Sequence, residues 1–204
     1  MKAAVYCSSS NPGKLREFAL AAGEFGELPF VVEPLPGLKE IRPPAENGAT
    51  FEENAAAKAL YYSQFTSVLV FADDSGLEVD ALAGAPGVCS ARYAGRDASD
   101  EANNALLLER LAGSRDRRAR FVCVLALAQA GHILGHFRGV VEGEMLQEAR
   151  GRNGFGYDPL FFYPPLGCSF GEIAPAEKFR VSHRGQALRI LFAHLRSLVA
   201  DNSR

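Results

Sequence analysis

Apolar positions along the chain follow two periodicities, which predicts strands and helices in alternation. Strands are expected at 3–7, 30–32, 68–72, 77–81, 121–129, 132–141 and 160–162. Helices are expected at 12–22, 50–64, 99–111 and 184–199. Interleaved patterns of this kind are typical of α/β layered folds. No internal repeat, low-complexity stretch or linker divides the chain, so we expect a single domain over residues 1–204.

Composition narrows the class of protein. Apolar residues make up 48% of the 204 positions and charged residues 23%, which excludes a disordered chain. The net charge of −2 provides no basic field for nucleic acid. The four cysteines show no disulfide or zinc spacing, and no apolar run approaches the length of a membrane span. We expect a cytoplasmic protein that binds neither membranes nor nucleic acid.

The turn after the first strand has the features of an anion site. Asn11 is a favoured helix N-cap and Pro12 a favoured first helical residue. Gly13 weakens the first turn of the helix and Lys14 opposes its dipole, which is explained if phosphate binds there. The alternative interpretation is a polar turn with a solvated lysine.

Two carboxylates follow the apolar run at 68–72. Ligands of α/β sheets gather at the carboxyl ends of strands, and Asp73 and Asp74 are expected at such an end. Successive strand residues point to opposite faces, so we do not expect both to chelate one ion. A magnesium or general-base role competes with a simple acidic turn through Ser75 and Gly76.

The segment Gly154–Pro159 combines two glycines with aromatic residues. It is suited either to stacking on a planar base or to a turn before the next strand.

Near the last helix, Lys178 precedes Ser182, His183 and Arg184 in sequence. Ser182 is expected to cap this helix, which places His183 and Arg184 in a first turn whose dipole they oppose. Anion binding and solvated surface cations are the two interpretations.

Taken together and in order, these motifs strongly resemble those of the inosine/xanthosine triphosphate pyrophosphatases, which remove deaminated purine nucleotides from the precursor pool. The resemblance extends from Val5 to about Leu195. It rests on Ser9–Lys14, Thr50–Ala55, Ala72–Leu77, Gly87–Tyr93, Gly154–Pro159 and Ser182–Gly185. One departure is Ser10, where the family usually has glycine.

The resemblance implies an elongated two-lobed α/β fold, with a central mixed sheet flanked by helices, a nucleotide-binding cleft and a homodimer. It implies that Asp74 is the proton acceptor and that Asp74 and Glu46 are ligands of Mg²⁺. Substrate would be bound by Ser9, Ser10, Asn11, Pro12, Gly13, Lys14, Ser75, Phe155, Gly156, Tyr157, Asp158, Lys178, His183 and Arg184.

The expected reaction is Mg²⁺-dependent hydrolysis of dITP, ITP or XTP at the α-phosphorus, which releases a nucleoside monophosphate and pyrophosphate. Two alternatives remain at this point. One is a pyrophosphatase for other modified nucleotides, and the other is a non-catalytic nucleotide- or RNA-binding module.

Overall fold

The computed structural model describes residues 2–201 and divides the chain into two compact units. Unit 1 comprises Met1–Asp74, Cys123–Gly139 and Arg184–Arg204, and unit 2 comprises Ser75–Val122 and Val140–His183. The end residues of the expected domain, 1 and 202–204, lie outside the described part. Within that part, no helix combines the length and the hydropathy needed to cross a membrane.

Seven strands form one mixed sheet, in agreement with the predicted fold class. They are β1 (Ala3–Cys7), β2 (Phe30–Pro34), β3 (Val70–Val79), β4 (Arg118–Gln129), β5 (His132–Met145), β6 (Phe161–Tyr163) and β7 (Cys168–Ser169). The strand order is β2-β1-β3-β4-β5-β6-β7. β1 pairs in parallel with β2 and β3, whereas β6 pairs antiparallel with β5 and β7.

The described residues 2–201 form five α-helices, four of which the sequence pattern predicts. They are α1 (Pro12–Glu24), α2 (Phe51–Tyr62), α3 (Asp100–Arg110), α4 (Pro175–Val181) and α5 (His183–Asp201), with short 3₁₀ segments at Ser63–Phe65, Asp80–Leu82, Gly87–Arg92 and Pro164–Leu166. The predicted N-cap of α1 is confirmed, because Asn11 accepts hydrogen bonds from the first turn of its helix, and Thr50 and Ser99 cap α2 and α3 in the same way. The short helix α4 was not predicted.

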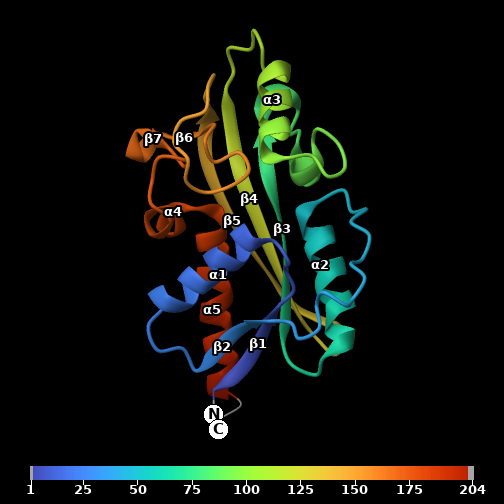
Figure 1. Cartoon of the computed structure of the whole chain (residues 1–204). Coiled ribbons are helices and arrows are strands. Elements are labelled where there is room, and N and C mark those ends of the chain that lie inside the picture. The colour runs from blue at the N-terminus through green and yellow to red at the C-terminus, as the bar shows by residue number, and fades with distance from the viewer. Residues whose placement is uncertain (1, 202–204) are drawn as a thin grey trace. The chain divides into compact units, whose positions relative to one another are not determined.

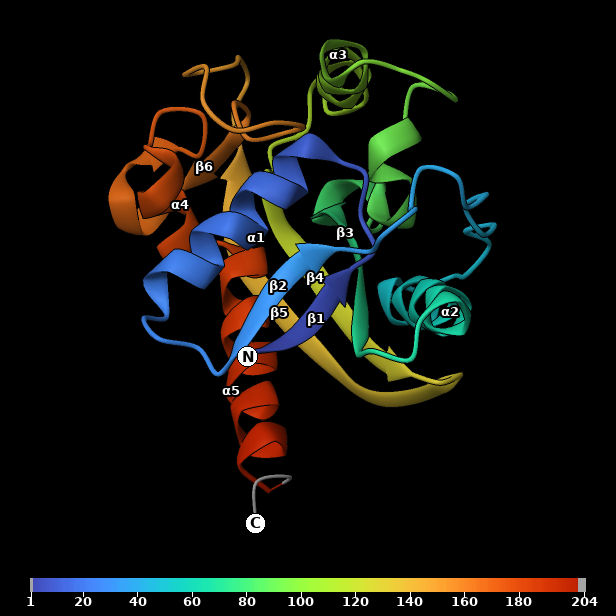
Figure 2. The same ribbon diagram turned by 60° about the horizontal axis from the view of Figure 1, so that its bottom comes forward.

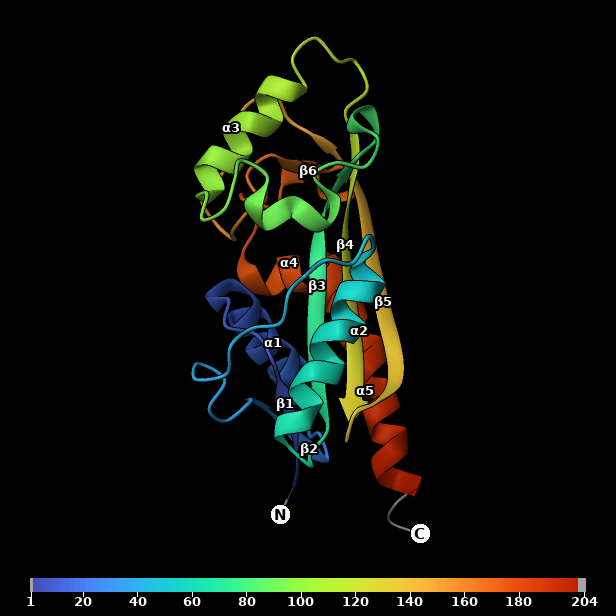
Figure 3. The same ribbon diagram turned by 90° about the vertical axis from the view of Figure 1, so that its right-hand side faces the viewer.

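Helices cover both faces of the unit 1 strands (Figures 1 and 2). α1 and α5 lie on one face, where Phe18 packs on Phe71 with ring centroids 5.3 Å apart and Phe30 packs on Phe192 at 5.4 Å. α2 lies on the other face and runs beside β3 (Figure 3). Neighbouring residues of β3 therefore face different helices.

β3 is one continuous strand, so the separate strands expected at 68–72 and 77–81 are wrong, and the alternative of an acidic turn between them is not found. Gly76 lies within the strand, where an added Cβ would come within 2.3 Å of Ser90 Oγ. The Leu77 N–H donates to the same Oγ at 2.9 Å. This glycine permits a close approach and does not mark a turn, and the two aspartates stand in mid-strand.

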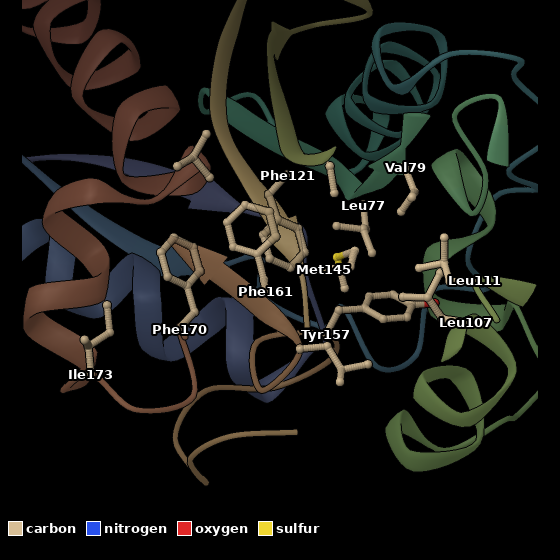
Figure 4. Packing of buried hydrophobic residues seen from close by; sticks show 13 residues of the cluster. Leu77, Val79, Leu107, Leu111, Phe121, Met145, Tyr157, Phe161, Phe170 and Ile173 are labelled. Carbon is tan, nitrogen blue, oxygen red and sulfur yellow. The ribbon is translucent and has the colours of Figure 1, made fainter. Parts of the chain in front are cut away.

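The core of unit 2 holds the 154–158 segment in place. Phe121, Phe161 and Phe170 pack together, and Tyr157 extends toward Leu107 (Figure 4). The Tyr157 hydroxyl is satisfied despite its burial, because it donates to the Ser90 carbonyl at 2.9 Å. Segment 154–158 is thus anchored by the Tyr157 side chain. Side chains of α3 bind it as well.

Candidate functional site

The start of α1 borders a cavity of about 440 Å³ in unit 1. It is lined by Ser8, Ser9, Ser10, Asn11, Lys14, Leu38, Lys39, Ile41, Pro43, Pro44, Glu46, Lys58, Tyr62 and Asp73. Three cations and two carboxylates are among these residues. The cavity therefore brings together most of the residues predicted to bind phosphate.

The helix N–H groups expected to bind phosphate already have a partner. Asn11 Oδ1 accepts from the Gly13 N–H at 2.8 Å and from the Lys14 N–H at 3.1 Å. Pro12, the first helical residue, has no N–H to offer. In this structure the cavity is thus lined on the α1 side by side chains of Ser9, Ser10, Asn11 and Lys14, and the first-turn N–H groups are bonded to the N-cap.

Asp73 faces the side of the sheet covered by α1 and α5. Its Oδ2 lies 2.8 Å from Lys14 Nζ and 3.8 Å from Arg184 Nη2, and Arg184 is in turn paired with Glu17 of α1. Burial alone would raise the pKa of Asp73, but Lys14 and Arg184 outweigh it and lower the pKa to about 2. Asp73 is thus a buried anion that binds Lys14.

Asp74 faces α2 and has separate partners, as the alternation of strand residues predicts. Its Oδ1 accepts from Lys58 Nζ at 2.9 Å and its Oδ2 from Asn54 Nδ2 at 3.2 Å. Burial raises the pKa of Asp74, and Lys58 opposes that rise. An aspartate with a raised pKa accepts a proton more readily than an exposed one, which suits a general base.

Glu46 and Asp74 share one cation, the ammonium of Lys58. Lys58 Nζ lies 3.0 Å from Glu46 Oε1 and 2.9 Å from Asp74 Oδ1. The pKa of Lys58 is raised: burial would lower it, but the carboxylates of Asp74, Asp73 and Glu46 outweigh that effect. We call Glu46, Lys58 and Asp74 the carboxylate–lysine cluster.

The donor set of this cluster fits a hard divalent cation. Two carboxylates already converge on one positive charge, and Mg²⁺ prefers carboxylate oxygens supplemented by water and substrate phosphates. Among the residues that the structure describes, no group of three or more His, Cys, Asp or Glu side chains is placed to hold a metal. A metal bound here would thus take only part of its coordination from the protein.

A second group of predicted residues lies in unit 2. Lys178 Nζ binds Asp158 Oδ2 at 2.6 Å and lies over the ring of Phe155, 4.9 Å from its centroid. Asp158 Oδ2 also accepts from the Phe155 N–H at 2.8 Å. Gly156 has a φ of +63°, which a glycine adopts without strain. Lys178, Asp158 and the segment backbone thus form one connected, largely buried group.

His183 and Arg184 are adjacent in sequence but their side chains contact different residues. The His183 ring stacks on Phe121 in unit 2, with centroids 4.8 Å apart. Arg184 is 2% exposed, and its guanidinium pairs with Glu17 and Asp73 in unit 1. The resemblance implies that both residues bind substrate, whereas the guanidinium of Arg184 pairs with Glu17 and Asp73. Ser75 follows Asp74 in β3 and is the first residue of unit 2.

Sequence reasoning did not find Asn54, Lys58 and Glu17. Asn54 and Lys58 are one helical turn apart on α2, so they share a face, and both are buried. The sequence signal for these two residues was a lysine four positions after an asparagine on an alanine-rich helix. Glu17 lies among the apolar residues of α1, and no local pattern reveals its partner Arg184.

Comparisons with known proteins agree on one family. Residues 5–194 match the model of the Ham1 family. A protein of Acidobacterium capsulatum named "dITP/XTP pyrophosphatase" is 49% identical, over 96% of this chain and 99% of its own. One of the same name from an Exiguobacterium strain is 51% identical, over 92% and 94%.

Solved structures give the same result. The Staphylococcus aureus Ham1 protein superposes with a TM-score of 0.84 and 39% identity, covering 95% of this chain and 98% of that one. A HAM1 protein from Coxiella burnetii superposes with a TM-score of 0.85 and 40% identity over the same shares.

Proposed function

The chain belongs to the Ham1 family, and from this we propose that it hydrolyses non-standard purine nucleoside triphosphates (dITP, ITP and XTP) to a nucleoside monophosphate and pyrophosphate. The observation that carries the proposal is the near full-length similarity to relatives named dITP/XTP pyrophosphatase. The charges of the unit 1 cavity support it, since hydrolysis of a triphosphate needs both cations and a base.

In the proposed mechanism Asp74 is the general base. Water donates its proton to the Asp74 carboxylate and attacks the α-phosphorus, and the bond to the β-phosphate oxygen breaks so that pyrophosphate leaves. Asn54 and Lys58 fix the orientation of that carboxylate through their bonds to its two oxygens. Lys14, with Ser9, Ser10 and Asn11 beside it, stabilises the charge that builds up on the leaving pyrophosphate.

Mg²⁺ is the cofactor of the proposal, held by Glu46 and Asp74. When bound, it supplies Lewis-acid stabilisation of the phosphate charge. The carboxylate–lysine cluster supports this assignment because Lys58 already occupies a cationic position between the two carboxylates.

The nucleobase is assigned to the unit 2 group. Hypoxanthine and xanthine carry an acceptor oxygen at position 6, where adenine carries an amino donor. A site with donors such as Lys178 and His183 pairs with the keto oxygen and leaves groups unpaired against adenine. Guanine also carries the keto oxygen, so it must be rejected through its 2-amino group. Asp158 and Gly156 are the residues proposed to contact that edge of the base.

A substrate panel tests the proposal. With separate detection of phosphate and pyrophosphate, we expect ITP, dITP and XTP to yield pyrophosphate, with kcat/KM at least about 10²-fold above those of ATP and GTP. Better turnover of a modified pyrimidine triphosphate would favour the alternative nucleotide pyrophosphatase. Binding without turnover would favour a non-catalytic module, and comparable kcat/KM for ATP and ITP would contradict the base assignment.

Lys14→Ala is expected to lower kcat/KM for ITP by about 10²-fold. The variant loses one charge-assisted contact to a developing anion, and it also leaves Asp73 with one cation fewer. The matched control is Arg16→Ala, which removes an exposed cation from the same helix but not from the cavity. Equal kinetics for the two variants would show that the phosphates are bound elsewhere.

The proposal includes a single domain, a homodimer and a cytoplasmic location. A single domain is supported by β3, β4 and β5, each of which contributes residues to both units. Light scattering coupled to size exclusion tests the dimer that the resemblance implies.

A further inference from the structure

The backbone N–H and carbonyl of Gly156 are both bound by side chains from one face of α3. Asp100 Oδ2 accepts from the Gly156 N–H at 2.6 Å, and Asn104 Nδ2 donates to the Gly156 carbonyl at 3.1 Å. Asp100 and Asn104 are four residues apart, so both project from the same side of the helix. An acceptor and a donor are thus matched to the N–H and the carbonyl of one residue, which belong to the two successive peptide groups on either side of its Cα.

Neither side chain is required to complete α3 itself. Ser99 already caps the helix, because its Oγ accepts from the Ala102 N–H at 3.2 Å. Asn104 Oδ1 is buried and has no hydrogen-bond partner among the described residues. An unsatisfied buried acceptor is unfavourable, and an apolar residue would avoid it, so packing of α3 does not account for an asparagine here.

The bound peptide lies at the centre of the 154–158 segment. Gly156 separates Phe155, whose ring lies under Lys178, from Tyr157, whose hydroxyl is fixed to Ser90. A rotation of the Gly156 peptide would therefore move Phe155 relative to Lys178. Gly156 has a positive φ and no side chain of its own, and the contacts from α3 bind its backbone directly.

We propose that Asp100 and Asn104 are positioning residues that fix the Phe155–Asp158 segment and thereby set the discrimination between nucleobases, which rests on the proposed function. The two contacts hold the segment in one conformation before substrate binds. A preorganised segment rejects a base that pairs badly, whereas a mobile one adapts to it. Neither residue is proposed to touch the reacting atoms.

The experiment compares Asp100→Ala, Asn104→Leu and the matched control Glu101→Ala. Glu101 is also in the first turn of α3 and is exposed, so its removal reproduces the loss of a carboxylate at the helix start. For each variant, kcat and KM are measured with ITP, ATP and GTP, together with the thermal midpoint.

We expect KM for ITP to rise about fivefold in Asp100→Ala and Asn104→Leu, with kcat within twofold of wild type. The ITP-to-ATP ratio of kcat/KM should fall in both variants and stay unchanged in Glu101→Ala. Asn104→Leu should keep or raise the thermal midpoint because it removes the unsatisfied acceptor. A changed base preference in Asn104→Leu at an undiminished thermal midpoint would separate positioning of the segment from stabilisation of the fold. Asn104→Leu also tests the positioning role if Asp100→Ala does not fold.

Different results would refute the proposed function and the positioning role of Asp100 and Asn104. Absence of pyrophosphate release from ITP by the wild-type protein would refute the proposed function. An active wild type whose two variants match Glu101→Ala in KM and base preference would overturn the positioning role. A fall in kcat with unchanged KM and base preference would overturn it as well.

Discussion

Asp74→Asn is expected to lower kcat for ITP by about 10⁴-fold while the fold is retained. Asparagine keeps the volume of the side chain and an oxygen for Lys58, but it cannot accept the proton of the attacking water. It also removes one of the two carboxylates that converge on Lys58. Pyrophosphate release measures the rate, and circular dichroism with the thermal midpoint measures folding. Activity within tenfold of wild type in a folded variant would refute the general-base role.

The pH dependence of kcat/KM is an independent test of Asp74 as the general base. The base must be deprotonated, so kcat/KM falls as the pH falls through the pKa of Asp74. Because burial raises that pKa, more than Lys58 lowers it, activity should be lost at a higher pH than for an ordinary aspartate. The residual activity of Asp74→Asn should lack this acid limb. A wild-type profile that is flat down to the ordinary range of aspartate would contradict the assignment.

The helices and strands were predictable because their signals are local. The predicted N-cap at Asn11 is a side chain that bonds to the first turn of its own helix, and the structure confirms it. The break expected between strands 68–72 and 77–81 was wrong because the reason for Gly76 is not local. Ser90, fourteen positions further on, fills the space where a side chain would stand. Sequence pattern alone does not distinguish a turn glycine from one that permits close approach.

The candidate site was predictable to the extent that its residues are typical of known chemistry. The lysine and aspartates could be proposed from residue type and position, but their counter-ions could not. Lys58 binds a carboxylate 16 positions away, and Arg184 binds one 167 positions away. Such pairs depend on which faces of α1, α2 and α5 meet β3, and that arrangement arises only when the sheet is assembled.

Arg184→Met is expected to destabilise the protein by about 3–5 kcal/mol, the largest effect on folding among these variants. Arg184, Glu17 and Asp73 are 2%, 7% and 4% exposed, so the substitution leaves two buried carboxylates without this cation. Burial would lower the pKa of the guanidinium, but Glu17 and Asp73 keep it raised, and the charge is therefore present. Urea unfolding measures the loss. Arg16→Met, an exposed position on α1, should change stability by less than about 0.5 kcal/mol.

The fall of the free energy of unfolding at low pH tests whether Arg184 stabilises the charged form of Asp73. In the wild type, the pKa of Asp73 is lowered from 3.8 to about 2, so its contribution is full above 3.8 and is lost as the pH falls through about 2. Without Arg184, Asp73 keeps its contact with Lys14 but loses one cation, so the loss of stability should begin at a higher pH. Adding Glu17→Gln to Arg184→Met should recover part of the stability, because it removes one buried charge. No recovery in the double variant would show that packing of the arginine stem, and not its charge, stabilises this region. Arg184 contacts Asp73, and Asp73 in turn binds Lys14. Base preference of an Arg184 variant must therefore be measured at a temperature at which that variant is folded.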